Sequence, residues 1–241
     1  MEDVFGKALL DYQNERYSED IYTYSSLDEK DVMPLPYLFR GFEAMPPVEK
    51  KALALCKGEV LDIGCGAGSH SLYLQQKGIA VTALDSSAGA IKTCKLRGIK
   101  NTLHTDIATF EDKKFDTLLL LMNGIGIVGN LKLLDQFLSH LKSLLKPGGQ
   151  ILLDSSDIIY MFADDEDPEN QENWKIDPEN YYGEVLFTMK YKGVKSNSFY
   201  WLYLDFDTLE SAANANNLAC DLIFKGNHYN YLARLATKIG K

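Results

Sequence analysis

The chain of 241 residues lacks the features that mark several large protein classes. Its four cysteines contain no Cys-x-x-Cys pair, so they suggest neither a disulfide framework nor a zinc site, and we expect no metal. No basic segment precedes an apolar one at the start of the chain, so no signal peptide is predicted. No apolar run approaches the ~20 residues of a membrane span. These absences predict a soluble, cytoplasmic protein.

A concentration of basic residues is also missing. Lys and Arg total 25 against 34 Asp and Glu, which gives a formal net charge of −9. Because binding to a phosphate backbone requires clustered cations, nucleic acid is not an expected partner. The length suits one α/β domain with an insertion, and a small-molecule substrate is the simplest partner. Nothing in the sequence indicates the oligomeric state.

The most informative segment is residues 59–68, Glu-Val-Leu-Asp-Ile-Gly-Cys-Gly-Ala-Gly. An apolar strand runs into three glycines at alternate positions, and residues 69–72 then begin a helix. Glycines at such a turn let a ligand lie against bare backbone at the positive end of the helix. The first βα unit of a doubly wound fold binds nucleotide-like cofactors in this way.

The glycine spacing departs from the Gly-x-Gly-x-x-Gly fingerprint of dinucleotide-binding folds. Counted from Gly64, the third glycine position is Ser69, and counted from Gly66 it is Ser71. The observed pattern, Asp-x-Gly-x-Gly-x-Gly from Asp62, resembles the first motif of the class I S-adenosylmethionine-dependent methyltransferases. A nicotinamide-dependent oxidoreductase is therefore the less favoured alternative.

Further landmarks follow in the order of this family. A buried strand ends at Asp85, which could accept both ribose hydroxyls of an adenosine or cap the helix that begins near Ser87. The apolar run over 115–122 is typical of a strand at the centre of a parallel sheet. The remaining landmarks are a short strand at 101–106, a leucine-striped helix at 131–145, a Lys-Pro-Gly-Gly turn at 146–149 and a strand at 151–154.

The resemblance covers residues 47–157 and implies an α/β fold with a doubly wound, seven-stranded sheet. The implied strand order is 3-2-1-4-5-7-6, with the last strand antiparallel in a closing hairpin. We expect residues 47–157 and 205–241 to form the core and residues 1–46 to form an N-terminal arm or lid. Residues 158–204 are expected to be an insertion over the substrate side that contains an antiparallel hairpin. Within it, the acidic run 164–172 is expected to be a mobile surface loop.

The resemblance also implies the roles of the cofactor-binding residues. Asp62 would orient the ammonium group of S-adenosylmethionine, and Asp85 would bind its ribose. Cys65, from its place inside the glycine turn, is interpreted as a small packing residue and not as a nucleophile. Asp106 and Ile107 would frame the adenine, while Asn123 and Gly124 would face the reacting methyl group. The predicted set is Asp62, Gly64, Cys65, Gly66, Gly68, Asp85, Ser86, Asp106, Ile107, Asn123 and Gly124.

The segment that begins at Asn123 also bears on the acceptor. Family members that methylate DNA bases or protein amides carry Pro-Pro-aromatic after an Asn or Asp at this position. Here the sequence is Asn-Gly-Ile-Gly over 123–126, which argues against both classes of acceptor.

The sequence does not identify a catalytic residue. In-line methyl transfer from a sulfonium depends mainly on positioning, and a base is needed only when the acceptor must lose a proton. The weak candidates are His70, Arg40 and Tyr200. His70 would reach the cofactor or acceptor, point to water or pack on the insertion, and Arg40 would bind a carboxylate of a ligand or pair with a surface acid. Tyr200 would line an acceptor pocket or belong to a small core of the insertion.

The other histidines are expected to have no role in the reaction. His104 would be structural, His140 would lie on the surface, and His228 would lie in the last hairpin turn. The predicted function is methyl transfer from S-adenosylmethionine to a small molecule. The alternatives are a non-catalytic cofactor-binding or regulatory protein of the same fold, the oxidoreductase, and an aminopropyl transferase, whose acidic polyamine-binding motif is not seen.

Overall fold

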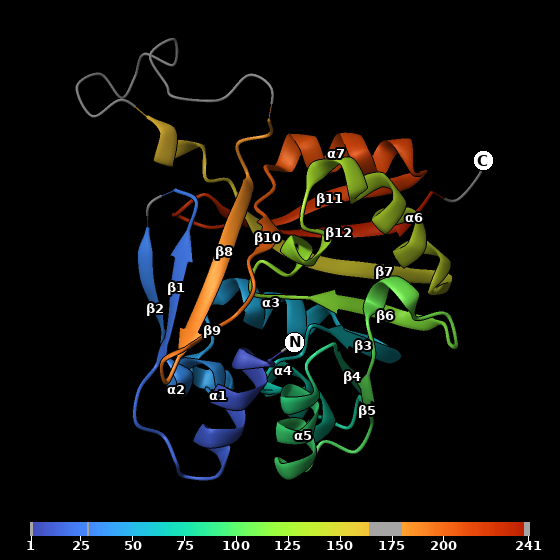
Figure 1. Ribbon diagram of the computed structural model, residues 1–241. Coiled ribbons are helices and arrows are strands. Elements are labelled where there is room, and N and C mark those ends of the chain that lie inside the picture. The colour runs from blue at the N-terminus through green and yellow to red at the C-terminus, as the bar shows by residue number, and fades with distance from the viewer. Residues whose placement is uncertain (1, 28, 164–179, 239–241) are drawn as a thin grey trace.

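The computed structural model describes residues 2–27, 29–163 and 180–238 (Figure 1). Its main sheet has seven strands in the order β5-β4-β3-β6-β7-β12-β11. The last strand of the chain, β12, is antiparallel to both its neighbours, and the strands from β5 to β7 are parallel. The predicted order and the antiparallel last strand are confirmed. The bounds are β3 Glu59–Ile63, β4 Ala80–Asp85, β5 Thr102–His104, β6 Phe115–Leu120, β7 Leu145–Ser156, β11 Leu218–Lys225 and β12 Asn230–Thr237.

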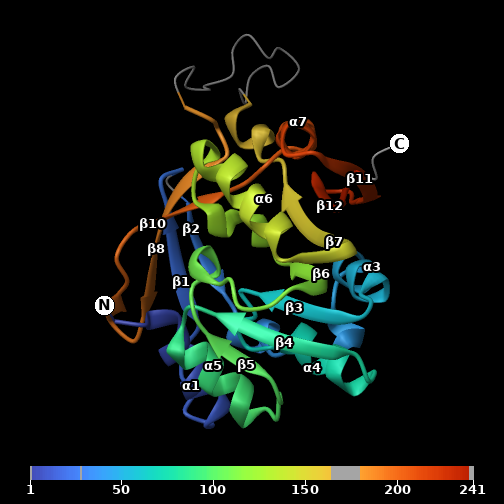
Figure 2. The same cartoon turned by 90° about the vertical axis from the view of Figure 1, so that its right-hand side faces the viewer.

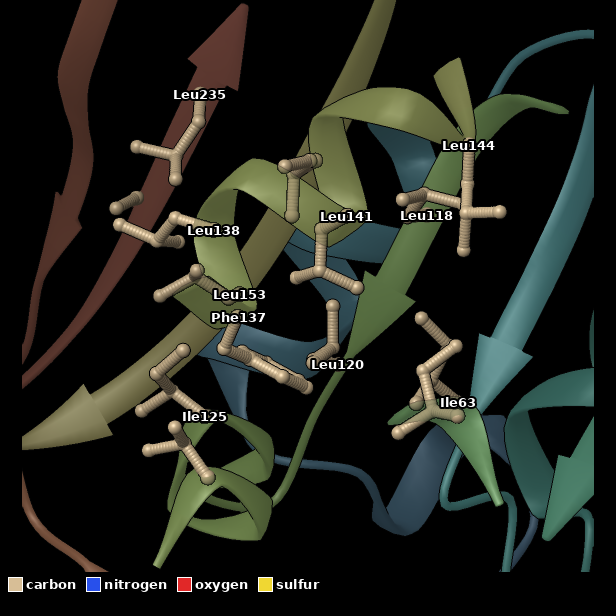
Figure 3. Close-up of a cluster of buried hydrophobic side chains, with 14 of the residues drawn as sticks. Ile63, Leu118, Leu120, Ile125, Phe137, Leu138, Leu141, Leu144, Leu153 and Leu235 are labelled. Atoms are coloured by element: carbon tan, nitrogen blue, oxygen red, sulfur yellow. The ribbon is translucent and has the colours of Figure 1, made fainter. Parts of the chain in front are cut away.

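Helices cover both faces of this sheet because its central strands carry apolar side chains on each side. Helices α6 (Leu134–Ser143) and α7 (Phe206–Ala215) pack on the face that contains Leu118 and Leu120. Figure 3 shows this packing for α6, whose Leu138 and Leu141 lie in the same cluster as these two leucines. On the opposite face, α3 (Pro47–Leu55) and α4 (Ser69–Gln76) pack against the side of β6 that contains Leu119. Helix α5 (Ala88–Leu96) covers β4. Among the described residues, no helix is long and apolar enough to cross a membrane.

A second sheet joins the N-terminal arm to the insertion. Its order is β10-β8-β1-β2, with β9 paired to β8, and all its pairings are antiparallel. The expected hairpin is present as β8 and β10, whereas the pairing of β8 with β1 was not predicted. The bounds are β1 Ile21–Ser25, β2 Lys30–Met33, β8 Glu184–Tyr191, β9 Val194–Lys195 and β10 Phe199–Leu202. The acidic run 164–172 lies outside the described residues.

The arm also contributes helices that approach the glycine turn. Helix α1 (Val4–Gln13) lies beside α5 in both views, and the two backbones meet at Gly6 and Gly89 (Figures 1 and 2). The Asp3 carboxylate caps α1 and accepts hydrogen bonds from Ser87 Oγ at 2.7 Å and Gly89 N at 2.9 Å. The short helices are α2 Leu35–Leu38, η1 Phe42–Ala44, η2 Ile107–Thr109, η3 Gly124–Val128, η4 Leu131–Leu133 and η5 Ile159–Phe162.

Candidate functional site

A cavity of about 1210 Å³ lies between the carboxyl ends of the parallel strands and the inner face of the second sheet. Doubly wound folds bind their ligands outside these strand ends, at the point where the strand order reverses. The walls include the start of α1, the glycine turn, the ends of β4 and β6, and residues from β1, β2, β8 and β10. The cavity is therefore formed jointly by the core, the arm and the insertion.

The glycine turn has the backbone conformation that the sequence indicated. Gly64, Gly66 and Gly68 have φ angles of +70°, +54° and +79°, a region that disfavours other residues. The N–H of Gly64 donates to Leu84 O at 2.9 Å, which fixes the turn against the end of β4. A Cβ on Gly66 would lie 3.6 Å from the Phe5 ring, so this glycine leaves space under the start of α1.

Asp85 is a buried carboxylate at the end of β4 that lines the cavity. Its oxygens accept the backbone N–H groups of Gly66 at 2.9 Å and Ser87 at 2.8 Å, and burial raises its pKa. No cation pairs with it among the described residues. The N-cap of α5 is Ser87, whose hydroxyl accepts from Ala90 N, so Asp85 is not the helix cap. It retains lone pairs that suit hydroxyl donors in the cavity.

The next strand end contributes Asp106 and Ile107. The Asp106 carboxylate caps η2 through Ala108 N at 2.9 Å, and Ile107 is buried. His140 was expected on the surface, but it is half-buried, and its Nε2 lies 2.7 Å from Ile107 O. His104 is exposed and bonds Ser86 O at 3.1 Å. His228 is exposed in the turn between β11 and β12, and only His104 of these three histidines lines the cavity.

Two of the candidate residues, Arg40 and His70, meet at one carboxylate. Glu49 on α3 binds Arg40 Nη2 through Oε1 and His70 Nε2 through Oε2, the latter at 2.8 Å. Burial raises the pKa of Glu49, but the hydrogen bonds of His70 and Arg40 and the charge of Arg40 outweigh it, so its pKa is lowered. Arg40 therefore pairs with a buried acid instead of a surface one, and His70 is buried and bonded to Glu49 instead of pointing to bulk water. Glu49 lies outside every motif, so sequence reasoning missed it.

Asp62 on β3 is also buried and lines the same cavity. Its Oδ2 accepts Ser71 Oγ at 2.7 Å, and it forms no ion pair among the described residues. Burial raises its pKa, although hydrogen bonds with Ser71 oppose that shift. An ammonium group in the cavity would give this carboxylate the cation that the protein does not supply.

Asn123 is tied to the protein more tightly than the sequence indicated. At the end of β6, Met122 has a φ angle of +64° and Asn123 one of +57°. The N–H of Asn123 donates to Asp154 Oδ1 at 2.8 Å. Its side-chain oxygen accepts Ser155 Oγ at 3.0 Å, and its amide nitrogen donates to Leu202 O at 3.3 Å. The side chain therefore joins β7 and β10, which occupies its polar atoms. Asn123 and Gly124 still line the cavity.

Cys65, in the glycine turn, packs against α5. Its Sγ lies 3.7 Å from the Sγ of Cys94, and both thiols are buried. The hydrogen bond to Cys94 and burial both raise the pKa of Cys65, which makes it a poor nucleophile. This environment agrees with a packing role. The contact with Cys94 had no signal in the spacing of the cysteines.

The inner face of the second sheet is largely aromatic. Phe187, Phe199 and Trp201 face the cavity, together with Val185 and Met189. Thr23, Ser25 and Asp31 add polar groups from β1 and β2. Tyr200 lies between two inward-facing residues of β10, so it points outward and is 50 % exposed. The structure therefore places Tyr200 away from the cavity.

Comparison with known proteins reveals close relatives. A family model described as a methyltransferase domain matches residues 61–153. An S-adenosylmethionine-dependent methyltransferase from Bacteroides fragilis, crystallised with S-adenosyl-L-homocysteine, superposes with a TM-score of 0.90. The two are 38 % identical, and the match covers 98 % of this chain and 95 % of that one. The chain belongs to the S-adenosylmethionine-dependent methyltransferases.

Curated relatives of this methyltransferase match over a shorter span. A ubiquinone biosynthesis O-methyltransferase of Rickettsia akari is 33 % identical over 104 residues, which is 41 % of this chain and 40 % of that protein. A demethylmenaquinone methyltransferase of Tropheryma whipplei is 30 % identical over 109 residues, covering 43 % and 44 % of the two chains. The chain thus spans less than half the length of these relatives.

The residues of this methyltransferase fit its cofactor. The strand order places Asp106, Asp85 and Asp62 in succession along one edge of the sheet. Asp85 and Asp62 are buried, and no cation pairs with either of them in the part of the chain that the structure describes. Such carboxylates suit ribose hydroxyls at Asp85 and an ammonium group at Asp62. The predicted family, fold and cofactor are confirmed. Membership of this family removes the nicotinamide-dependent alternative.

Proposed function

We propose that the protein transfers the methyl group of S-adenosylmethionine to a small-molecule acceptor held against the second sheet. The observation that carries this proposal is a single cavity that runs from Asp85 and the glycine turn to Phe187 and Trp201. S-adenosylmethionine supplies an activated methyl group, so the chain's own task is to orient both ligands and exclude water. The aromatic wall and the enclosed strand ends suit both tasks.

We assign the cofactor to the residues along the strand ends. Asp85 and Ser86 would bind the ribose, Asp106 and Ile107 would frame the adenine, and the glycine turn would approach the sulfur. Asp62 would attract the ammonium group. Asn123 and Gly124 would contribute backbone to this site, because the Asn123 side chain is already bonded. The proposed set is Asp62, Gly64, Cys65, Gly66, Gly68, Asp85, Ser86, Asp106, Ile107, Asn123 and Gly124.

We assign the acceptor to the aromatic wall, and the favoured class is a flat, largely apolar ring with a polar substituent. Phe187, Phe199 and Trp201 offer ring faces and edges, and Thr23 and Asp31 offer hydrogen bonds on the adjoining strands. The names of the curated relatives refer to ubiquinone and demethylmenaquinone, which supports a ring acceptor. The arm (1–46) and the insertion (158–204) would then be the substrate-side segments, with 47–157 and 205–241 as the core.

Calorimetry and a transfer assay test the proposal. The protein should bind S-adenosylmethionine and S-adenosylhomocysteine but neither NAD nor NADP. It should also move a labelled methyl group from S-adenosylmethionine to members of a panel of hydroxynaphthalenes, but not to cyclohexanediols. Binding of S-adenosylhomocysteine without transfer to any panel member would favour the non-catalytic alternative. A cytoplasmic location and the lack of nucleic-acid binding stay predictions from the sequence.

A further inference from the structure

Glu49 is a buried carboxylate that joins the arm, α3 and the helix after the glycine turn. It lies in the first turn of α3 and is 2 % exposed. One oxygen bonds Arg40, which follows α2 in the arm, and the other bonds His70 in the first turn of α4. A buried carboxylate that is bonded through both oxygens fixes the orientation of the two side chains that it binds.

The Arg40 guanidinium is held on three sides. Its carbon lies 3.9 Å from the centre of the Tyr37 ring, and Nη1 donates to Tyr37 O at 2.6 Å. Its side chain is 3 % exposed, so an uncompensated charge there would be strongly destabilising. Glu49 supplies the compensating charge and fixes the plane of the guanidinium, and Arg40 is among the residues that line the cavity.

Glu49 also fixes the orientation of the His70 ring. Because an ionised carboxylate only accepts hydrogen bonds, Nε2 of His70 carries the proton that donates to Oε2. In a neutral ring this leaves Nδ1 as an acceptor. Nδ1 has no partner among the described residues and is not fully enclosed by them, and His70 lines the cavity.

The strand order indicates which part of the cofactor would meet this pair. With the adenine near Asp106, just after β5, and the ribose near Asp85 at the end of β4, the amino-acid end falls beside β3 and the start of α4. We propose that Glu49 is a positioning residue, which holds Arg40 and His70 so that they recognise the carboxylate and ammonium groups of the cofactor. This inference rests on the proposed function.

The chemistry of the pair complements a zwitterion. Arg40 supplies N–H donors for a carboxylate, and Nδ1 of His70 supplies a lone pair for an ammonium N–H. Without Glu49, Arg40 would lose the charge that holds it, and His70 would lose the bond that places its proton on Nε2. The expected result is loss of recognition of the amino-acid end alone.

Two ligands that differ only at that end test the proposal. S-adenosylhomocysteine has the amino-acid end, whereas 5′-methylthioadenosine keeps the adenosine and the thioether but lacks it. In the full chain, Glu49→Gln should weaken S-adenosylhomocysteine about 10-fold or more, since charged hydrogen bonds are lost. Its affinity for 5′-methylthioadenosine should be unchanged. Calorimetry gives both affinities, and thermal unfolding shows whether the variant is folded.

Two further variants complete the test. His70→Gln keeps an N–H donor for Glu49 but has no acceptor where Nδ1 lies, so it should show the same selective loss in a folded protein. Glu59→Gln removes an exposed carboxylate that pairs with Lys113 and Lys146 at the far end of the sheet, and it should change neither affinity. The proposal would be overturned if Glu49→Gln and His70→Gln weakened both ligands equally. It would also be overturned if neither variant weakened S-adenosylhomocysteine. A parent protein that binds neither ligand would instead refute the proposed function.

Discussion

The carboxylate of Asp85 accepts the backbone N–H of Gly66 at 2.9 Å, which ties the end of β4 to the glycine turn. A residue proposed to bind ribose is therefore also a support of the turn that lies against the cofactor. Its second oxygen accepts Ser87 N at 2.8 Å, at the start of α5. One side chain thus fixes two of the elements that surround the proposed ribose site.

Replacing Asp85 should weaken the cofactor more than it destabilises the fold. Asp85→Ala removes a buried acceptor of ribose hydroxyls, a loss of ~1.5–3 kcal/mol, so the Kd for S-adenosylhomocysteine should rise about 10–150-fold. Calorimetry measures this change. Asp116→Ala is the matched control, because Asp116 also accepts a backbone N–H, that of Glu59 at 2.8 Å, at the start of β6 away from the cavity. The control should lose stability but no affinity, and equal affinities in parent and Asp85→Ala would disprove the ribose assignment.

Gly66→Val should abolish cofactor binding and leave the protein folded. The valine would fill space beside Phe5 and adopt a left-handed conformation that costs ~1–2 kcal/mol. Gly78→Val is the control for backbone strain, since Gly78 has a φ of +79° and nothing within 4 Å of its would-be Cβ. Both variants should lower the melting temperature, but only Gly66→Val should lose binding in calorimetry. If both kept their affinity, the turn would have only a structural role.

Local patterns predict the main sheet better than they predict the site. The apolar run at 115–122 and the glycine turn each depend on neighbours in the chain, and both were placed correctly. The pairing of β1 with β8 joins residues more than 160 positions apart, and each strand alone is short and mixed in polarity. Nothing local distinguishes it from a strand that pairs elsewhere. Long-range pairing is therefore where the sequence is least informative.

The same reasoning explains the side chains whose partners the sequence did not predict. Glu49 has no motif, and its role exists only because α3 brings it between Arg40 and His70. Asn123 was expected to face the methyl group, and its side-chain oxygen accepts a hydrogen bond from Ser155 at the end of β7. The alternation within β10 puts half of its side chains on each face, but the sequence does not say which half faces the cavity. Tyr200 falls on the outer half.

Asp154 should make stability depend on pH near neutrality. Burial raises the pKa of Asp154 to about 7, against ~3.9 in the unfolded chain. Asp154 is therefore protonated more readily in the folded protein than in the unfolded chain. Its stabilising contribution is fully present below the unfolded pKa and is lost as the pH rises towards 7. Asp154→Asn does not titrate but keeps an oxygen for the N–H groups of Asn123 and Gly124. Relative to this variant, the parent should lose ~2–3 kcal/mol of unfolding free energy between about pH 5 and pH 8.

Urea unfolding at both pH values measures the Asp154 effect, and Asp205→Asn is its control. Asp205 caps α7 through Thr208 N, and although burial raises its pKa, the hydrogen bonds from Thr208 and Tyr181 outweigh this and lower it. Its stabilising contribution is therefore lost only as the pH falls into the acidic range, and its effect should be constant between the two conditions. A parent and an Asp154→Asn variant with parallel pH profiles would contradict the shifted pKa.

The aromatic wall should affect the acceptor without affecting the cofactor. Phe187→Ala removes an inward-facing ring of β8, so the KM for a transferred acceptor should rise about 10-fold, as expected for ~1.5 kcal/mol of lost ring contact. The Kd for S-adenosylhomocysteine should be unchanged. Leu186→Ala, one residue earlier on the outer face of the same strand, should alter neither constant. Steady-state kinetics that show equal effects of the two substitutions would place the acceptor elsewhere.

The arm and the insertion should respond to the cofactor as one unit. Because β1 and β8 share backbone hydrogen bonds and both line the cavity, one strand cannot open without exposing the edge of the other. Enclosure of ligands by such segments keeps water from the reacting centre. We therefore predict that S-adenosylhomocysteine slows hydrogen exchange of Ile21–Ser25 and Glu184–Tyr191 by similar factors, together with residues 62–70. The hairpin β11–β12 lies at the far edge of the main sheet and should exchange as before. Protection confined to residues 62–70 would mean that the second sheet is a fixed wall, already closed before the cofactor binds.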